Sequence, residues 1–179
     1  MVLSDFDLEN AIKAKRIIIK PFSQEIIREN GIDMRLSNEI SYHNDLGQDF
    51  VLDPTDEDQI KKSYGKLIKS NKLILNPKEQ VLLSTYEYLS LPDDVVGFVE
   101  LRSTWARHGL SMPPTIIDAG FKGTITLEVI NNAPFKILLR PKQRFAHIIF
   151  IKTSNKVKKA YVGSYLNQRG IKFPKKIDS

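Results

Sequence analysis

The sequence contains no cysteine among its 179 residues. Disulfide bonds, a thiolate nucleophile and a cysteine-ligated zinc site are therefore excluded. No apolar run approaches the roughly 20 residues that a membrane-spanning helix needs. The first ten residues, MVLSDFDLEN, also lack the basic and apolar regions of a secretory signal. These absences predict a cytoplasmic protein with no membrane partner.

Common catalytic motifs are missing as well. The chain has no GxxxxGK[ST] or GxGxxG phosphate loop, no HExxH zinc motif and no GxSxG nucleophile elbow. Its three histidines, His43, His108 and His147, are too scattered in sequence to predict a metal cluster. His147 lies in an apolar run and is interpreted as a satisfied core residue, and His108 as a residue at the rim of a site.

The composition, with 41% hydrophobic and 27% charged residues, is typical of a soluble globular protein, and the length predicts one domain over residues 1–179. The net charge is +6, and much of the excess lies near the C-terminus, at Lys156, Lys158, Lys159, Lys172, Lys175 and Lys176. We interpret these lysines as a solvated basic tail and expect no nucleic-acid partner. A polyanionic small ligand such as a nucleoside triphosphate is compatible with the charge.

Short predicted strands alternate with turn signals about every 8 to 12 residues, which predicts an all-β barrel or sandwich. The expected strands are 16–20, 31–36, 39–43, 72–75, 80–85, 86–91, 95–101, 124–130, 135–139 and 144–151.

Small helices are expected near the start of the chain. Ser4 and Asp7 form a capping-box-like signal for a helix that runs to about Ala14. Ser23 is a candidate cap for a second helix over 24–29. Residues 53–70 are polar and are expected to form a surface excursion with a short helix around 56–62.

The stretch from residue 101 to 131 carries the densest set of functional side chains. Arg102 and Arg107 flank a Ser-Thr pair, and guanidinium groups bind phosphate oxygens in a fixed geometry. Each arginine alone is equally compatible with a surface salt bridge. Asp118 follows two isoleucines, and such a carboxylate in an apolar setting needs either solvent or a partner.

Glu128 lies inside a predicted strand. Alternation puts Glu128 on one face with Thr124 and Thr126, and the aliphatic residues on the other. The strand alone favours a glutamate that faces water. The functional alternative is a carboxylate held in a site.

Several segments together resemble the dCTP deaminase and dUTPase family. They are RSTWAR, IDAGFKG and TLE in the central stretch, LSDFDLENAIKAKRIIIKPF and ENGIDMRL near the start, and YLNQRG in an arm that begins at about residue 160. The resemblance covers nearly the whole chain. It implies a distorted jelly-roll β-barrel of the dUTPase type and a homotrimer whose three sites lie at subunit boundaries.

The resemblance also implies a set of substrate-binding residues. The segment that grips the triphosphate is Arg102, Ser103, Thr104, Trp105, Ala106 and Arg107. Asp118 binds the deoxyribose 3′-hydroxyl. The residues expected beside the base and in the closing arm are Pro114, Thr126, Leu127, Glu128, Tyr161 and Gln168. Mg²⁺ is expected to arrive on the nucleotide phosphates, with no zinc and no metal ligands from the protein.

Glu128 favours a deaminase, because the family's pure dUTPases have an aliphatic residue there. The implied reaction converts dCTP to dUTP and ammonia, with dUTP as a further ligand and dTTP as an inhibitor. Without cysteine the zinc route to a deaminase is closed. The hypothesis is that Glu128 shuttles protons, that Ser103 and a main-chain carbonyl near Pro114 orient the water, and that Arg107 supports developing charge.

Three departures from the family pattern leave alternatives open. Ile116 stands where the better-known deaminases have arginine, and the loop over 109–118 is about two residues short, as in dUTPases. Both favour a bifunctional enzyme that converts dCTP through dUTP to dUMP and pyrophosphate. The third departure is Ser164, which replaces the arm's usual lysine and for which Lys172 or Arg169 would substitute.

Three functions are therefore open: a deaminase, a bifunctional deaminase and diphosphatase, and a non-catalytic nucleotide-binding or nucleic-acid-binding barrel.

Overall fold

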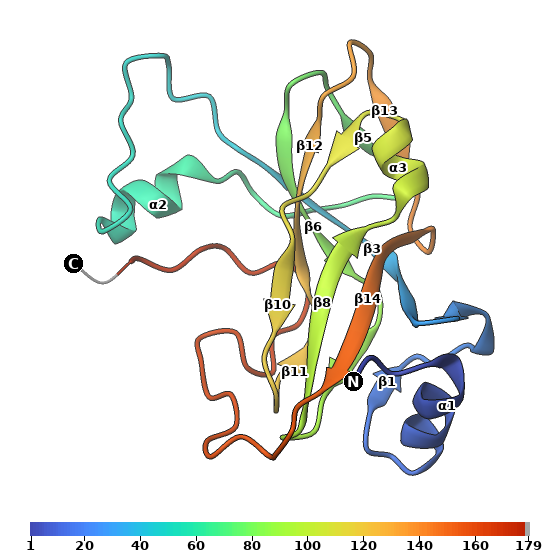
Figure 1. Ribbon diagram of the computed structural model, residues 1–179. Coiled ribbons are helices and arrows are strands. Elements are labelled where there is room, and N and C mark those ends of the chain that lie inside the picture. The colour runs from blue at the N-terminus through green and yellow to red at the C-terminus, as the bar shows by residue number, and fades with distance from the viewer. Residues whose placement is uncertain (178–179) are drawn as a thin grey trace.

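The computed structural model describes residues 1–177 as curled antiparallel sheets with short helices at their margins (Figure 1). The helical elements are α1 (Asp5–Lys13), the 3-10 turn η1 (Gln24–Ile26), α2 (Glu57–Ser63) and α3 (Ser103–Arg107). The strands are β1 (Ile18–Lys20), β2 (Ile27–Arg28), β3 (Gly31–Tyr42), β4 (Ile68–Lys69), β5 (Leu73–Leu75), β6 (Gln80–Thr85), β7 (Tyr88–Ser90), β8 (Val95–Leu101), β9 (Leu110–Ser111), β10 (Thr115–Ile117), β11 (Lys122–Gly123), β12 (Thr126–Asn131), β13 (Ile137–Leu139) and β14 (Arg144–Lys152).

The long strand β3 connects the two halves of the main sheet. It pairs with β14 through its first half and with β6 through its second half. The order along the sheet is β10-β8-β14-β3-β6-β12-β9, and smaller sheets join β1, β7 and β11, and β5 and β13. The all-β prediction is confirmed. The predicted strands 31–36 and 39–43 are one strand with a register shift between Leu36 and Ile40.

The core lies between the sheets, and its largest fully buried side chains include Phe145 and Phe150 of β14. Strand β12 buries alternate residues, so Leu127 and Val129 face the core. Thr126 and Glu128 therefore point away from it, on the side where the site is described below.

The first helix confirms its capping signal. The Ser4 hydroxyl accepts a hydrogen bond from the Asp7 backbone N–H at 3.3 Å, and the Asp7 carboxylate accepts one from the Ser4 backbone N–H at 3.0 Å. The predicted second helix over 24–29 is wrong. Only the 3-10 turn Gln24–Ile26 forms, without a side-chain cap at Ser23, because the next residues pair with β3 as strand β2.

Helix α2 lies in the polar excursion between β3 and β4, which extends from the sheets in Figure 1. Asp56 caps it by accepting from the backbone N–H groups of Asp58 and Gln59. The excursion is better anchored than its polarity suggests, because Ile60 is only 5% exposed. Within residues 1–177, no helix has the length and apolarity needed to cross a membrane.

Candidate active site

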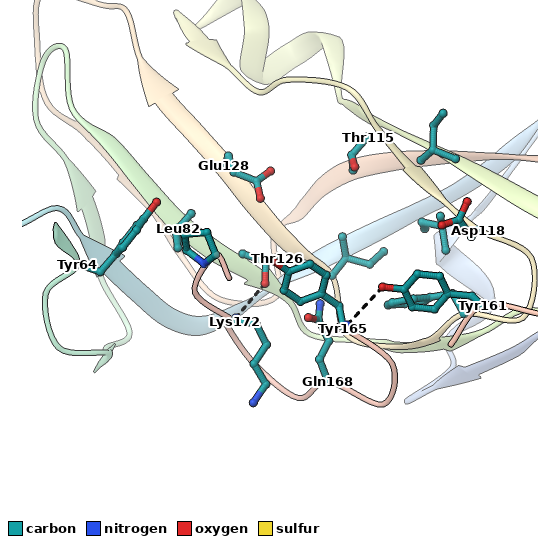
Figure 2. A pocket seen from close by; sticks show the side chains of 15 residues that line it. Tyr64, Leu82, Thr115, Asp118, Thr126, Glu128, Tyr161, Tyr165, Gln168 and Lys172 are labelled. Atoms are coloured by element: carbon teal, nitrogen blue, oxygen red, sulfur yellow. Dashed lines mark hydrogen bonds between the residues drawn. The ribbon is translucent and has the colours of Figure 1, made fainter. Parts of the chain in front are cut away.

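A pocket lies between β10, β12 and the C-terminal arm (residues 160–177), and Figure 2 shows the side chains around it. The strands supply Glu128 and Thr126 from β12 and Leu82 from β6, and Asp118 follows β10. In Figure 2 Glu128 is drawn between Leu82 and Thr115, and Asp118 lies nearer Tyr161. The full lining is Tyr64, Leu82, Thr115, Ile116, Ile117, Asp118, Phe121, Ile125, Thr126, Glu128, Tyr161, Tyr165, Gln168, Lys172 and Pro174.

Glu128 is half-buried in this pocket. Within residues 1–177 its carboxylate forms neither an ion pair nor a side-chain hydrogen bond to another residue. Burial raises the pKa of Glu128 above its ordinary value, and its own backbone N–H offsets only part of that shift. A carboxyl group with a raised pKa is a stronger base when ionised and is closer to being an acid at neutral pH. It can therefore move protons in both directions.

The arm closes one side of the pocket. The Lys172 backbone N–H donates to the Thr126 hydroxyl at 3.0 Å, and the Tyr165 N–H donates to the Tyr161 hydroxyl at 3.3 Å (Figure 2). The Gln168 side chain is 7% exposed and donates to the Thr124 carbonyl, while its Oε1 is buried without a partner in the described chain. Most buried amide oxygens are hydrogen-bonded, so this oxygen is an exception.

The arm contains Ser164, which replaces the family's usual lysine, and the two basic residues expected to substitute for that lysine. Lys172 lines the pocket, whereas Arg169 lies over the Tyr88 ring, 4.0 Å from its centroid. Of the two substitutes expected from the sequence, Lys172 is therefore the one that lines the pocket.

Tyr64 was missed by sequence reasoning. It ends α2 in the polar excursion, yet its ring reaches the pocket and lies between His43 and Phe173, with ring centroids 4.5 Å and 5.3 Å away. Burial, and then the charge of Glu128, raise the pKa of Tyr64. An aromatic residue in a polar segment was the only signal available.

The predicted phosphate segment lies elsewhere in the single chain. Arg102, Ser103 and Thr104 line a second pocket that shares no lining residue with the Glu128 pocket. Arg107 and Ala106 are exposed on α3. One chain therefore does not bring Glu128 together with the arginines.

Three other predicted residues have different surroundings. The Trp105 Nε1–H donates to the Arg144 carbonyl at 2.9 Å, and its ring packs on Phe145. Pro114 is exposed beside Thr115, which lines the pocket. The Leu127 side chain is buried in the core, so only its main chain can face a ligand.

The second pocket is organised around Asp33 of β3, whose side chain is 3% exposed. Its Oδ2 lies 3.1 Å from Arg102 Nε and 3.7 Å from Arg144 Nη1, and its Oδ1 lies 3.0 Å from His147 Nδ1. Oδ2 receives no well-aligned hydrogen bond, so charge rather than donor geometry holds these contacts. His147 is thus partnered, as predicted, although it is partly exposed.

Within the part of the chain that the structure describes, no group of three or more histidine, aspartate and glutamate side chains could hold a metal ion.

Known proteins resemble this chain in sequence and in structure. A family model described as dCTP deaminase-like matches residues 2–153. A dCTP deaminase of Caldivirga maquilingensis is 42% identical over 176 residues, which cover 98% of this chain and 96% of that protein. A dCTP deaminase of Sulfurisphaera tokodaii is 44% identical over 175 residues, covering 98% and 92%.

Solved structures agree on the fold. The 2′-deoxycytidine 5′-triphosphate deaminase of Agrobacterium tumefaciens matches with a TM-score of 0.65 and 16% identity, over 83% of this chain and 47% of that one, so the chain spans about half of its length. A dUTPase of Staphylococcus bacteriophage 80alpha matches with a TM-score of 0.50 and 13% identity, over 83% and 97%. These matches confirm the predicted dUTPase-like jelly-roll fold, and the sequence matches show that the chain belongs to the dCTP deaminase-like family.

Proposed function

We propose that the protein is a dCTP deaminase that works in the cytoplasm and converts dCTP and water to dUTP and ammonia. The observation that carries the proposal is Glu128, a half-buried carboxylate without an ion-pair partner in residues 1–177 and with a raised pKa. It lies in a pocket of a chain whose close relatives are named dCTP deaminases. Acid–base catalysis needs such a group.

In the proposed reaction, Glu128 acts twice. Its carboxylate takes a proton from water as the water oxygen bonds to C4 of cytosine, and it gives this proton to N3. It then takes the proton of the new hydroxyl and transfers it to the amino group. The C4–N bond breaks, ammonia leaves, and the C4 carbonyl of uracil forms. Ser103 and a carbonyl near Pro114 orient the water, and Arg107 stabilises the developing negative charge.

The remaining pocket residues bind the nucleotide. Asp118 accepts from the 3′-hydroxyl, Thr126 and the Leu127 main chain lie along the base, and Tyr161 and Gln168 close the pocket. Arg102 through Arg107 bind the triphosphate, and Mg²⁺ accompanies the phosphates. In this proposal dUTP binds as product and dTTP as inhibitor.

The separation of the two pockets supports a shared site. Glu128 and α3 belong to different pockets of one chain, so both sets of groups can meet only if another copy supplies one of them. We propose a homotrimer in which each site takes Glu128 and the arm from one copy and α3 from its neighbour.

The second candidate function is a bifunctional deaminase and diphosphatase. Ile116 favours it, because an exposed isoleucine lines the pocket where the better-known deaminases have arginine. In that enzyme Asp118 would help a second water to attack the α-phosphate of dUTP, which gives dUMP and pyrophosphate.

One assay separates these functions. The protein is incubated with dCTP and Mg²⁺, the nucleotides are separated, and ammonia and pyrophosphate are measured. Formation of dUTP with one ammonia per nucleotide is the expected result. Formation of dUMP with pyrophosphate would favour the bifunctional enzyme, and unchanged dCTP would overturn both proposals in favour of a binding protein.

A further inference from the structure

The C-terminal arm lies along residues 124–126, where the strand that carries Glu128 begins. The Thr124 backbone N–H donates to the Gln168 carbonyl at 3.1 Å, and the Thr124 hydroxyl donates to the Gly170 carbonyl at 3.2 Å. Two residues farther on, Lys172 is bonded to Thr126. Of the five arm residues that line the pocket, Gln168 and Lys172 therefore flank the segment Arg169–Ile171 on its two sides.

Glu39 contacts the segment between Gln168 and Lys172, although it does not line the pocket. The side chain of Glu39 on β3 is 15% exposed, and its Oε2 accepts from the Ile171 backbone N–H at 3.0 Å. Ile171 is itself buried. Gly170 has φ +64°, and a methyl group on it would collide with the Glu39 carboxylate. The close approach therefore requires both the carboxylate and a residue without a side chain.

Alternation accounts for the direction of Glu39. Ser41 of β3 pairs with Leu82 of β6, and Leu82 pairs with Glu128 of β12, so Glu39, two residues before Ser41, lies on the same face of the sheet as Glu128. The other charge near the Glu39 carboxylate is Lys69, whose Nζ is 3.7 Å away and whose side chain is 66% exposed. A surface pair of this kind is weak, so Lys69 leaves the carboxylate free to bond the arm.

We propose that Glu39 is a positioning residue for the substrate site: its carboxylate fixes the arm at Ile171 and so holds Gln168 and Lys172 over the pocket. The consequence for dCTP rests on the proposed function, whereas the anchoring of the arm does not. A charge-assisted bond to one backbone N–H is strong enough to shift a local opening equilibrium by about tenfold or more.

The first test measures the arm without substrate. Trypsin cleavage after Lys172 is followed by mass spectrometry and divided by cleavage after Lys159, an exposed residue before the docked segment. In Glu39→Ala this ratio should rise about tenfold, because cleavage of a docked segment follows its open fraction. Glu39→Gln keeps an acceptor oxygen and should stay within about threefold of the parent. Lys69→Ala, which leaves the Ile171 bond intact, should not change the ratio.

The second test measures turnover of dCTP. Glu39→Ala should raise KM about tenfold and lower kcat less than about threefold, because saturating nucleotide closes the arm again. Gly170→Ala should change KM and kcat in the same way, because the added methyl group disrupts the same contact from the arm. The double variant should lose less than the product of the two single losses, because both remove one interaction.

The outcomes separate the anchor from the function. An unchanged cleavage ratio in both Glu39→Ala and Gly170→Ala overturns the proposal, and so do multiplicative losses in the double variant. If the ratio changes as expected while the parent protein leaves dCTP intact, the anchor stands and the proposed function fails. Melting temperatures show whether each variant is folded. If either Glu39→Ala or Gly170→Ala is unfolded, the cleavage ratio of the other one tests the proposal.

Discussion

Two carboxylates on neighbouring parts of the barrel have opposite surroundings. Asp33 is almost fully buried and faces Arg28, Arg102, Arg144 and His147. Glu128 is half-buried and meets no cation in residues 1–177, and burial raises its pKa. Asp33 is surrounded by cations and can order guanidinium groups, whereas burial raises the pKa of Glu128 and so favours proton exchange at that carboxyl. The partners of a carboxyl group, more than its depth, therefore decide whether it is suited to a structural or a chemical role.

The largest expected effect is the loss of deamination when Glu128 is replaced. Glu128→Gln keeps the shape of the side chain but cannot accept and return a proton, so kcat for deamination should fall about 10³-fold. The dissociation constant for dCTP, measured by calorimetry, should stay within about threefold. Glu9→Gln, on α1 and outside the pocket, is the matched control and should keep full activity. Deamination within about tenfold of the parent would remove Glu128 from its proposed role.

Mixing two inactive variants tests whether the two pockets meet between copies. Arg107→Ala and Glu128→Gln subunits are denatured together, refolded and assayed for ammonia release from dCTP. In a cyclic trimer with shared sites, random mixing should give about a quarter of the parent activity, because each site needs an intact Glu128 beside an intact Arg107 of the neighbour. Each variant refolded alone is the control. No recovery in verified mixed trimers would contradict the shared site.

Replacing Asp33 tests whether this carboxylate stabilises the fold. Asp33→Asn leaves the cations around Asp33 without their anion, so the free energy of unfolding should fall by about 3 kcal/mol. Urea unfolding at pH 7 measures the change. The affinity for dCTP should also fall, by about tenfold, because Arg102 loses the group that orients it. Stability equal to that of the parent would show that the cations do not depend on Asp33.

Much of the fold was predictable, because local signals and tertiary packing agree there. The capping box at Ser4, the strands over 80–85 and 95–101 and the alternation around Glu128 all appear as expected. The helix predicted over 24–29 failed because pairing with β3 outweighed a weak local preference. Helix α3 was not expected, since its five residues carry no side-chain cap and few apolar positions.

The site was predictable only in part, and the reason is distance along the chain. Glu128, Asp118, Thr126, Tyr161 and Gln168 were expected and share one pocket. Tyr64 and the Glu39 anchor could not be found from the sequence, because both reach their positions through the fold: one at the end of a polar excursion, the other through its contact with the arm. Neither Tyr64 nor Glu39 belongs to a recognisable sequence motif.

The smallest expected effect concerns stability and has the opposite sign to that of Asp33→Asn. Because burial raises the pKa of Glu128, protonation stabilises the folded state, and this stability is complete below the unfolded pKa near 4.5 and is lost as pH rises through the folded value. At pH 7 Glu128→Gln removes a buried charge and should raise the free energy of unfolding by about 1 kcal/mol. Urea unfolding at pH 7 and near pH 4 measures the difference, which should shrink at the lower pH. A Glu128→Gln protein less stable than the parent at pH 7 would mean that the carboxylate has a stabilising partner, and the contrast with Asp33 would disappear.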